Sequence, residues 1–333
     1  MSVEAELPQA VRAGQLEDLY EKQLLPRLAS LEELRRKARN LVTLAGLGAA
    51  VFVVSIFAFD SLPRGIAVAG PGLGGALALC AGILGNRCWR AYRKQFKQDI
   101  VREVFLLVDP GLVYVPDRHI SEETYKHSEL YLNQVDRFTG DDYVSGTRGE
   151  TEFEFSEIHA EYKTESRDSK GNTRTTWHTI FRGIFFHADF HKHIQSETFV
   201  LPDTAEGWLG KTVGQFFQSK NFRRDELVRL EDEEFERSFC VYSDDQIDAR
   251  YILTPDMMRR ILDLKRKVGR KVALAFKGSR VYVAVSYAEE LFEPKLYGSG
   301  IEFAHVRTFH AILEDTLGIV DDLNLNTRIW TKR

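Results

Sequence analysis

The apolar residues of the chain are unevenly spread, and their strongest pattern lies near the N-terminus. Residues 41–59 form a run of 19 residues without a charged side chain, and residues 66–85 form a second run of 20. At 1.5 Å per residue, the first run is about 28 Å long as an α-helix, close to the hydrocarbon thickness of a bilayer. The short connector joins antiparallel neighbours. The pattern therefore predicts a transmembrane helical hairpin.

Basic residues flank this hairpin and predict its orientation. The connector between the two runs carries only Arg64. The other basic residues precede the first run or follow the second: Arg35, Arg36, Lys37, Arg39, Arg87, Arg90, Arg93, Lys94 and Lys97. Lys and Arg resist translocation, so both termini of a multi-pass protein are expected in the cytoplasm. A signal peptide is not favoured, because the first run is too long for one and a second span follows. Neither run offers an ionisable residue for a transport path.

Small residues follow one stripe of the second run. Gly70 and Gly74 form a G-x-x-x-G pattern that Ala78 continues, and such a stripe lets two helices approach closely. Contact between the two spans of one chain is one reading, and a homo-oligomer formed through these residues is the other. The same segment satisfies the G-x-G-x-x-G dinucleotide pattern, which its place inside a membrane span argues against.

Amphipathic stretches lie on both sides of the hairpin. Apolar residues recur every three or four positions from Leu16 to Leu34, and the Ser30-x-x-Glu33 spacing resembles a capping box at a helix start. A second, more basic stripe follows the hairpin. The predicted organisation is an amphipathic cytoplasmic helix (1–40), the two-span hairpin (41–85), a basic juxtamembrane helix (86–105) and a cytoplasmic domain (106–333).

The remainder of the chain reads as short strands mixed with helices. The clearest hairpin joins residues 151–163 to 173–186 through a turn at 168–172, with Phe153, Phe155, Ile158, Tyr162 and Trp177 expected on one partly buried face. A strand at 198–201, helices near 212–219, 255–267 and 303–317, and a hairpin at 271–285 follow. Tight turns between strands favour antiparallel pairing. The fold class is therefore α+β, with a mixed, mainly antiparallel sheet.

Composition narrows the class of protein. Of 333 residues, 44% are hydrophobic and 28% charged, and the formal net charge is −4. This composition excludes a chain that is disordered throughout, and the lack of a basic surplus argues against a nucleic-acid binder. Cys80, Cys88 and Cys240 are too scattered for a disulfide framework or a cysteine-based zinc site. An inert, buried Cys240 is the expectation.

One row of residues has the chemistry of a metal site. His187, Asp189, His191 and His193 alternate, so an extended strand would place all four on one face. Imidazole nitrogens and a carboxylate could bind Zn²⁺ there. The alternative is a polar, solvent-facing strand or a turn that breaks the alignment.

Two weaker patterns complete the candidate chemistry. Residues 205–212 approximate a phosphate-binding loop, but Ala205, Trp208 and Leu209 do not suit a loop that wraps phosphate, so an ordinary helix start is favoured. Five acidic residues are expected next to turns, where turn and cap roles compete with general acid–base chemistry: Asp141, Asp142, Glu157, Asp244 and Asp245.

Five motifs in order resemble the bacterial DUF3137 family: GDDYVSG (140–146), FEFSEIHAEYK (153–163), FRGIFFHADFHK (181–192), TFVLPD (198–203) and FCVYSDDQIDARYILTP (239–255). The resemblance covers residues 100–310 or so and includes the family's N-terminal hairpin. It implies a bacterial inner-membrane protein with a cytoplasmic domain. It supplies no catalytic residues, because the family is uncharacterised.

Two functions from different classes follow. The first is a membrane-tethered binding or scaffolding module that meets a protein partner or lipid at the cytoplasmic face. The second is a membrane-bound enzyme, a hydrolase or a metal-dependent one, using the acidic residues or the histidine row. The absence of a nucleophile elbow, a zinc-protease motif or a good phosphate loop favours the first and implies no cofactor. Whether the chain is an enzyme stays open.

Overall fold

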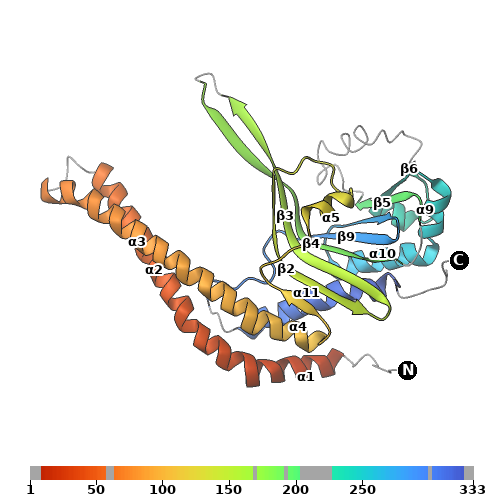
Figure 1. The fold of residues 1–333 in the computed structure, drawn as a ribbon, viewed down its shortest axis with the longest axis horizontal. Helices are drawn as coiled ribbons and strands as arrows, with labels where there is room; N and C mark the ends of the chain where they lie inside the picture. Colours follow the sequence, from red (N-terminus) through yellow and green to blue (C-terminus); the bar gives the residue numbers. More distant parts are fainter. Residues whose placement is uncertain are drawn as a thin grey trace. The chain divides into compact units, whose positions relative to one another are not determined.

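The chain folds into two compact units, seen in a computed structural model that describes residues 9–57, 64–167, 171–190, 194–202, 227–298 and 302–325 (Figure 1). The helical unit comprises residues 1–108 and 292–310, and the sheet unit comprises residues 109–291 and 311–333. Residues 292–310 thus group with the N-terminal helices, although they follow the sheet in sequence. The four-segment division made from the sequence stays a prediction.

The helical unit is built from two long helical stretches. The first contains α1 (Gln9–Leu19), the π-helical turn η1 (Tyr20–Leu24) and α2 (Leu25–Phe57); the second contains α3 (Arg64–Phe96), η3 (Lys97–Val101) and α4 (Arg102–Val108). The helix start predicted at Ser30 is wrong. Ser30 lies inside α2, where its hydroxyl donates to the carbonyl of Arg27 at 2.7 Å, a bond that serine makes within helices.

Helices α2 and α3 run antiparallel and touch through small residues. A Cβ added to Gly74 would lie 2.7 Å from the backbone nitrogen of Phe52, and one added to Gly48 would lie 2.7 Å from that of Ala78. Near the opposite end of the contact, Gly85 lies against Val42. The predicted small-residue stripe is therefore used within the chain, and an oligomer through it remains a prediction.

Both helical stretches are candidate membrane spans. Residues 14–57 and 69–108 are long enough and apolar enough to cross a bilayer. Only 11% and 17% of their most apolar windows are buried within the protein. An internal helix of a soluble protein would have most of such a window buried, so the two helices suggest association with a membrane.

The sheet unit contains one antiparallel sheet of nine strands among the described residues, in the order β1-β2-β3-β4-β9-β8-β5-β7-β6. This architecture, preceded by the apolar helical pair, confirms the α+β class. The strands are β1 (Val113–Val115), β2 (Arg137–Arg148), β3 (Thr151–Arg167), β4 (Thr173–Asp189), β5 (Glu197–Pro202), β6 (Leu227–Val228), β7 (Phe239–Ser243), β8 (Val272–Lys277) and β9 (Arg280–Ser286).

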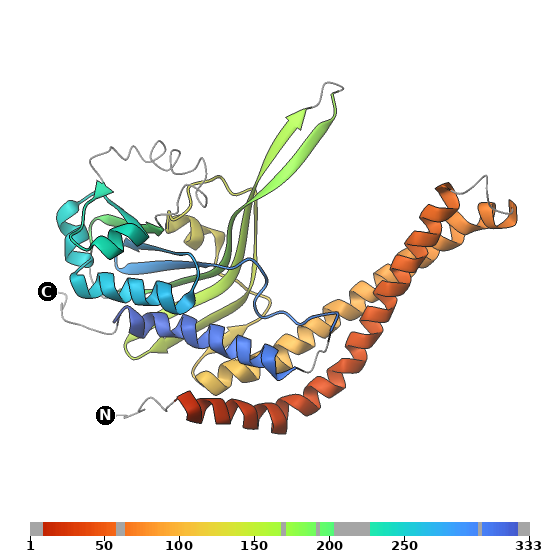
Figure 2. The ribbon, with the colours of Figure 1, turned by 180° about the vertical axis from the view of Figure 1, so that it is seen from behind.

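Helices cover both faces of this sheet (Figures 1 and 2). Helix α5 (Glu122–His127) lies on one face, and α10 (Pro255–Val268) with the sheet-unit part of α11 (Phe303–Asp322) lies on the other. Strand β3 is accordingly buried on both faces: Phe155 and Ile158, which have opposite orientations along a strand, are 1% and 0% exposed. The expectation of one shared face was wrong, because it ignored this second layer.

Several predicted elements are confirmed with longer bounds, namely the two hairpins and the helices at α10 and α11. The long strand β2 was missed, and so were several short elements: α5, which Ser121 caps through a hydrogen bond from the Thr124 amide, and also β1, β6, β7, α8 (Glu233–Ser238) and α9 (Gln246–Ile252). The phosphate-loop pattern at 205–212 and the helix near 212–219 lie outside the described residues.

Candidate functional site

An irregularity in β2 brings two consecutive aspartates to one place. The register between β2 and β3 shifts between Asp141 and Val144, and Asp142 adopts a positive φ of 54°. Side chains of consecutive strand residues normally point to opposite faces, so such a bulge is needed to bring both carboxylates together. Asp141 lies directly opposite Glu157 of β3 in the register.

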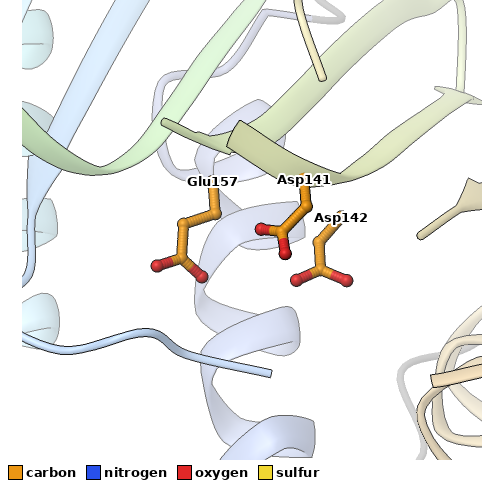
Figure 3. A group of neighbouring side chains, drawn as sticks. All are labelled: Asp141, Asp142 and Glu157. Carbon is orange, nitrogen blue, oxygen red and sulfur yellow. The ribbon is translucent and has the colours of Figure 1, made fainter. Parts of the chain in front are cut away.

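These three residues, Asp141, Asp142 and Glu157, form the carboxylate cluster (Figure 3). Each offers an oxygen within 4.8 Å of the others. Asp142 is 1% exposed and Glu157 is 5% exposed. The expectation that these residues stand next to turns was wrong, because Asp141 and Asp142 lie inside β2 and Glu157 lies in the middle of β3.

Two carboxylates of the cluster accept hydrogen bonds from the protein. The Tyr114 hydroxyl donates to Asp142 Oδ1 at 2.5 Å, and the Leu291 amide donates to Glu157 Oε2 at 2.9 Å. Clustered carboxylates either bind a divalent cation through their oxygens or share protons, because like charges in a buried site disfavour full ionisation. The geometry of the carboxylate cluster is therefore compatible both with cation binding and with acid–base chemistry.

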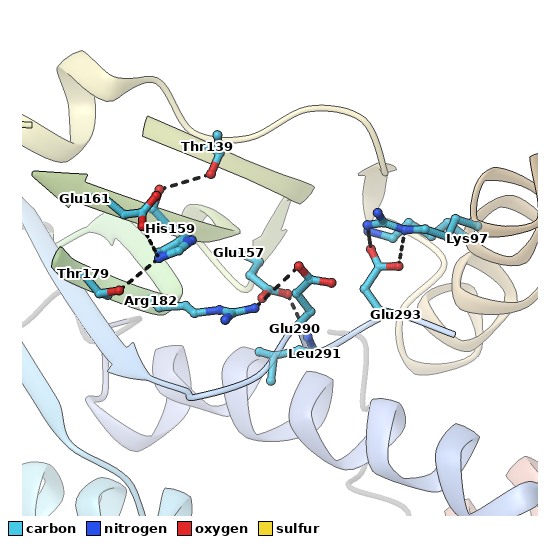
Figure 4. Close-up of polar contacts among 11 residues, drawn as sticks. Lys97, Thr139, Glu157, His159, Glu161, Thr179, Arg182, Glu290, Leu291 and Glu293 are labelled. Atoms are coloured by element: carbon cyan, nitrogen blue, oxygen red, sulfur yellow. Dashed lines mark hydrogen bonds and ion pairs between the residues drawn. The ribbon is translucent and has the colours of Figure 1, made fainter. Parts of the chain in front are cut away.

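A row of polar side chains continues along β3 from the cluster (Figure 4). Glu157, His159 and Glu161 alternate and so share one face. His159 Nε2 lies 3.2 Å from the Thr179 hydroxyl and 3.8 Å from Glu161 Oε1. Burial lowers the pKa of His159, and the positive charge of Arg182 lowers it further, which favours a neutral imidazole at pH 7. Arg182 Nη2 lies 3.5 Å from Glu290 Oε1.

The structure places His187, the first member of the predicted metal row, inside β4 with both ring nitrogens engaged. Its Nδ1 lies 2.9 Å from the Arg280 guanidinium, and its Nε2 lies 3.5 Å from Glu154 Oε2. A guanidinium can only donate, so Nδ1 accepts and the proton belongs on Nε2, facing Glu154. This hydrogen bond lowers the pKa of Glu154.

Of the other three members of the predicted metal row, the structure describes only Asp189. Asp189 ends β4 and is paired with Arg280 in the strand register. His191 and His193 lie outside the described residues. Zinc binding by the row stays a prediction, and it would require His187 to exchange its present partners for the metal.

The other singled-out residues have structural contacts. Asp245 caps α9 by accepting from the Ile247 amide at 2.7 Å, as predicted for a cap. Asp244 Oδ1 accepts from the Glu197 amide at 2.8 Å. Cys240 lies in β7 and is intermediate in exposure, so the expectation of a buried thiol was wrong.

The helical unit contains a buried ion cluster of its own (Figure 4). Glu293 pairs with Lys97 at 2.7 Å and also binds the guanidinium of Arg93. The side chain of Lys97 is only 5% exposed. Nearby, the buried Arg35 pairs with Glu32 at 2.5 Å and donates to the carbonyl of Leu296 at 2.8 Å. These contacts hold residues 293–296 against α2 and α3.

The fold and these sites define an α+β protein with an N-terminal pair of candidate membrane helices. A family model described as "Protein of unknown function (DUF3137)" matches residues 179–325. The match confirms the resemblance seen in the sequence over residues 179–325. The motifs at 140–146 and 153–163, which carry the carboxylate cluster, precede the matched range. No curated protein and no solved structure matches the chain.

The polar row was missed although a signal for it was present. In residues 153–163, Glu157, His159 and Glu161 alternate with apolar residues, and that period places them on one face of a strand. The aspartates of β2 gave no such signal. Gly140, Asp141 and Asp142 are typical of turns, and only the bulge reconciles them with a strand.

Proposed function

We propose that the chain is a multi-pass protein of a bacterial inner membrane, in which two antiparallel spans anchor an α+β unit at the cytoplasmic face. The observation that carries this proposal is the pairing of two exposed apolar helices whose basic flanks lie at the same end. Lys and Arg are retained on the cytoplasmic side, so this arrangement favours cytoplasmic termini. The family resemblance supports the bacterial membrane.

Reporter fusions test the orientation. A fluorescent protein fused after Arg333 is expected to fluoresce, and alkaline phosphatase at that position is expected to be inactive, because the phosphatase matures only outside the cytoplasm. The matched control places each reporter after Pro63, where the opposite pattern is expected. An active phosphatase after Arg333, or a full chain extracted from membranes by alkaline carbonate, would contradict the proposal.

The proposed role of the anchored unit is to bind a protein partner. This role is supported by the large α+β unit that the anchor holds near the bilayer and by the lack of a motif for a defined reaction. Crosslinking in native membranes tests this role. The full chain is compared with a control chain in which a fluorescent protein replaces everything after residue 105. A partner of the sheet unit is expected with the full chain only. Identical crosslinks from both chains would contradict it.

A second candidate function, a metal-dependent membrane-bound enzyme, is favoured by the carboxylate cluster. The full chain is unfolded thermally in EDTA and in Mg²⁺, Ca²⁺, Mn²⁺ or Zn²⁺. A saturable stabilisation that disappears in the Glu157→Gln variant supports this candidate, because ligands of the folded state raise its stability. The control is Glu152→Gln, at an exposed position of the same strand. No ion-specific stabilisation would remove the candidate.

A further inference from the structure

A group of exposed cations in the helical unit lies just before the first uncharged run (41–59) and just after the second (66–85). This basic collar consists of Arg36, Lys37, Arg87, Arg90 and Lys94. The first two belong to α2 and the other three to α3. All five are exposed, in contrast to Arg35 and Lys97 of the same unit, which are buried.

A contact between the helices places Lys37 of α2 and Arg87 of α3 at similar depth. Gly85 of α3 lies against Leu41 and Val42 of α2, where both uncharged runs end. Lys37 precedes Leu41 by four residues, and Arg87 follows Gly85 by two, so both lie within about 6 Å of this level along their helices. Trp89 lies in the same layer of α3, and Trp is enriched at the headgroup level of membrane proteins.

The collar is not neutralised as the buried cations beside it are. Arg35 is paired with Glu32, and Glu293 neutralises Lys97 and Arg93. Arg36 lies 4.0 Å from that same Glu32. Arg90 donates to the Asn86 amide oxygen at 3.4 Å, which adds no negative charge. Among the residues that the structure describes, Lys37, Arg87 and Lys94 show no ion pair.

We propose that the basic collar binds the phosphate groups of anionic phospholipids in the cytoplasmic leaflet. This inference rests on the proposed membrane anchoring and adds the class of lipid. Guanidinium groups bind phosphate oxygens in a bidentate manner, and basic clusters next to a span attract anionic headgroups. Lys37 and Arg87 lie at the same level, so both helices present a cation to the headgroup layer.

Lipid selectivity measured with the full chain tests the proposal. The chain is reconstituted into phosphatidylcholine vesicles that contain one spin-labelled lipid, either phosphatidylglycerol or phosphatidylcholine, and the motionally restricted fraction is measured. The wild type is expected to prefer phosphatidylglycerol roughly three- to tenfold at low salt and less at high salt. Replacing all five collar residues by Gln is expected to bring the ratio near one.

The control variant removes the same number of positive charges from the sheet unit: Lys126→Gln, Arg174→Gln, Arg229→Gln, Arg237→Gln and Arg259→Gln. It is expected to retain the preference. Equal preference in the wild type and the collar variant, or equal loss in the control, would overturn the proposal. So would a saturable effect of inorganic phosphate at matched ionic strength, which would assign the collar to soluble phosphate.

The design separates this inference from the proposed function. If the wild type fails to incorporate into phosphatidylcholine vesicles, the membrane anchor itself is wrong. If it incorporates but shows no preference between the two spin-labelled lipids, the anchor stands and only the inference about the collar fails.

Discussion

Gly74 lies where α3 meets α2 with no space for a side chain. A Cβ there would lie 2.7 Å from the Phe52 nitrogen and 2.9 Å from the Gly48 carbonyl oxygen, and backbone atoms cannot move aside cheaply. Gly72, two residues earlier on the same helix, has nothing within 4 Å of such a Cβ. The two glycines therefore provide a matched pair for testing the helical hairpin.

We expect Gly74→Leu to destabilise the helical unit by about 2 kcal/mol or more, because the two helices must separate. Gly72→Leu is expected to stay within about 0.5 kcal/mol of the wild type. Thermal unfolding in detergent measures both. Equal effects of the two substitutions would show that the close contact of α2 and α3 does not form.

The ion cluster around Glu293 predicts a strong asymmetry between single and double variants. Glu293→Gln removes a carboxylate that pairs with the buried ammonium of Lys97 and is expected to cost about 3 kcal/mol. Adding Lys97→Met to that variant is expected to recover part of the loss, since an apolar side chain tolerates burial. Thermal unfolding measures the series, and Glu289→Gln, at an exposed position, is the control. A double variant less stable than Glu293→Gln alone would contradict the prediction.

The Glu32–Arg35 pair predicts a dependence on pH. The hydrogen bond from Arg35 lowers the pKa of Glu32 below its ordinary value of 4.5. A carboxyl whose folded-state pKa is lowered stabilises the protein above its unfolded pKa, and this stabilisation is lost as the pH falls through the folded pKa. The wild type is therefore expected to exceed Glu32→Gln in stability at pH 7. The difference should shrink from pH 4.5 downward, and a constant difference in unfolding temperature would contradict the assignment.

At the scale of elements, the β3–β4 hairpin extends beyond the strands that flank it. Strand β2 pairs with β3 only as far as Glu161, and β9 pairs with β4 only from Gly183. Beyond these points the hairpin is a two-stranded arm, with residues 163–167 and 173–177 exposed (Figure 1). The Arg137 guanidinium lies over the ring of Trp177, 3.7 Å from the ring centroid.

Hydrogen exchange is expected to divide this hairpin. A two-stranded ribbon is marginally stable without a third strand or a packed face, so amides in 163–167 and 173–177 should exchange through local opening. Amides in 153–160 and 181–188, which lie in the full sheet, should exchange orders of magnitude more slowly. Mass spectrometry of peptides from one sample provides both measurements. Equal protection throughout would mean that the arm has a further partner.

At the scale of the whole molecule, the helical unit is discontinuous in sequence. The chain leaves it after Val108 and returns for residues 292–310. Within this unit, the ring of Phe292 lies 5.4 Å from that of Phe105, and the ring of Phe309 lies 6.1 Å from that of Phe96. The second segment thus depends on the first for its apolar contacts.

A fragment that begins at residue 109 is therefore expected to expose apolar surface. It retains Phe292 and Phe309 but loses Phe105 and Phe96, so it should bind a hydrophobic dye such as ANS more strongly than the full chain. The same fragment with Phe292→Ser and Phe309→Ser is the control and should bind less dye. A fragment that binds no more dye than the full chain would show that residues 292–310 pack without the N-terminal helices.

Local patterns in the sequence determined the elements with strong periodicity. Long uncharged runs predicted the apolar helices, alternation and turn residues predicted the two main hairpins, and helical spacing predicted α10 and α11. These signals suffice because they depend on neighbours along the chain. The bounds of the first hairpin extended further than predicted because β3 pairs with β4 as far as Arg167 and β4 pairs with β9 as far as Asp189.

Contacts between residues far apart in sequence determined the features that no local pattern predicted. The bulge that brings Asp141 and Asp142 to Glu157, the burial of β3 on both faces, and the grouping of residues 292–310 with the first helices arise from partners far away in sequence. A periodic pattern shows which residues share a face. It cannot show what covers that face, because the free energy of burial depends on the layer packed against it.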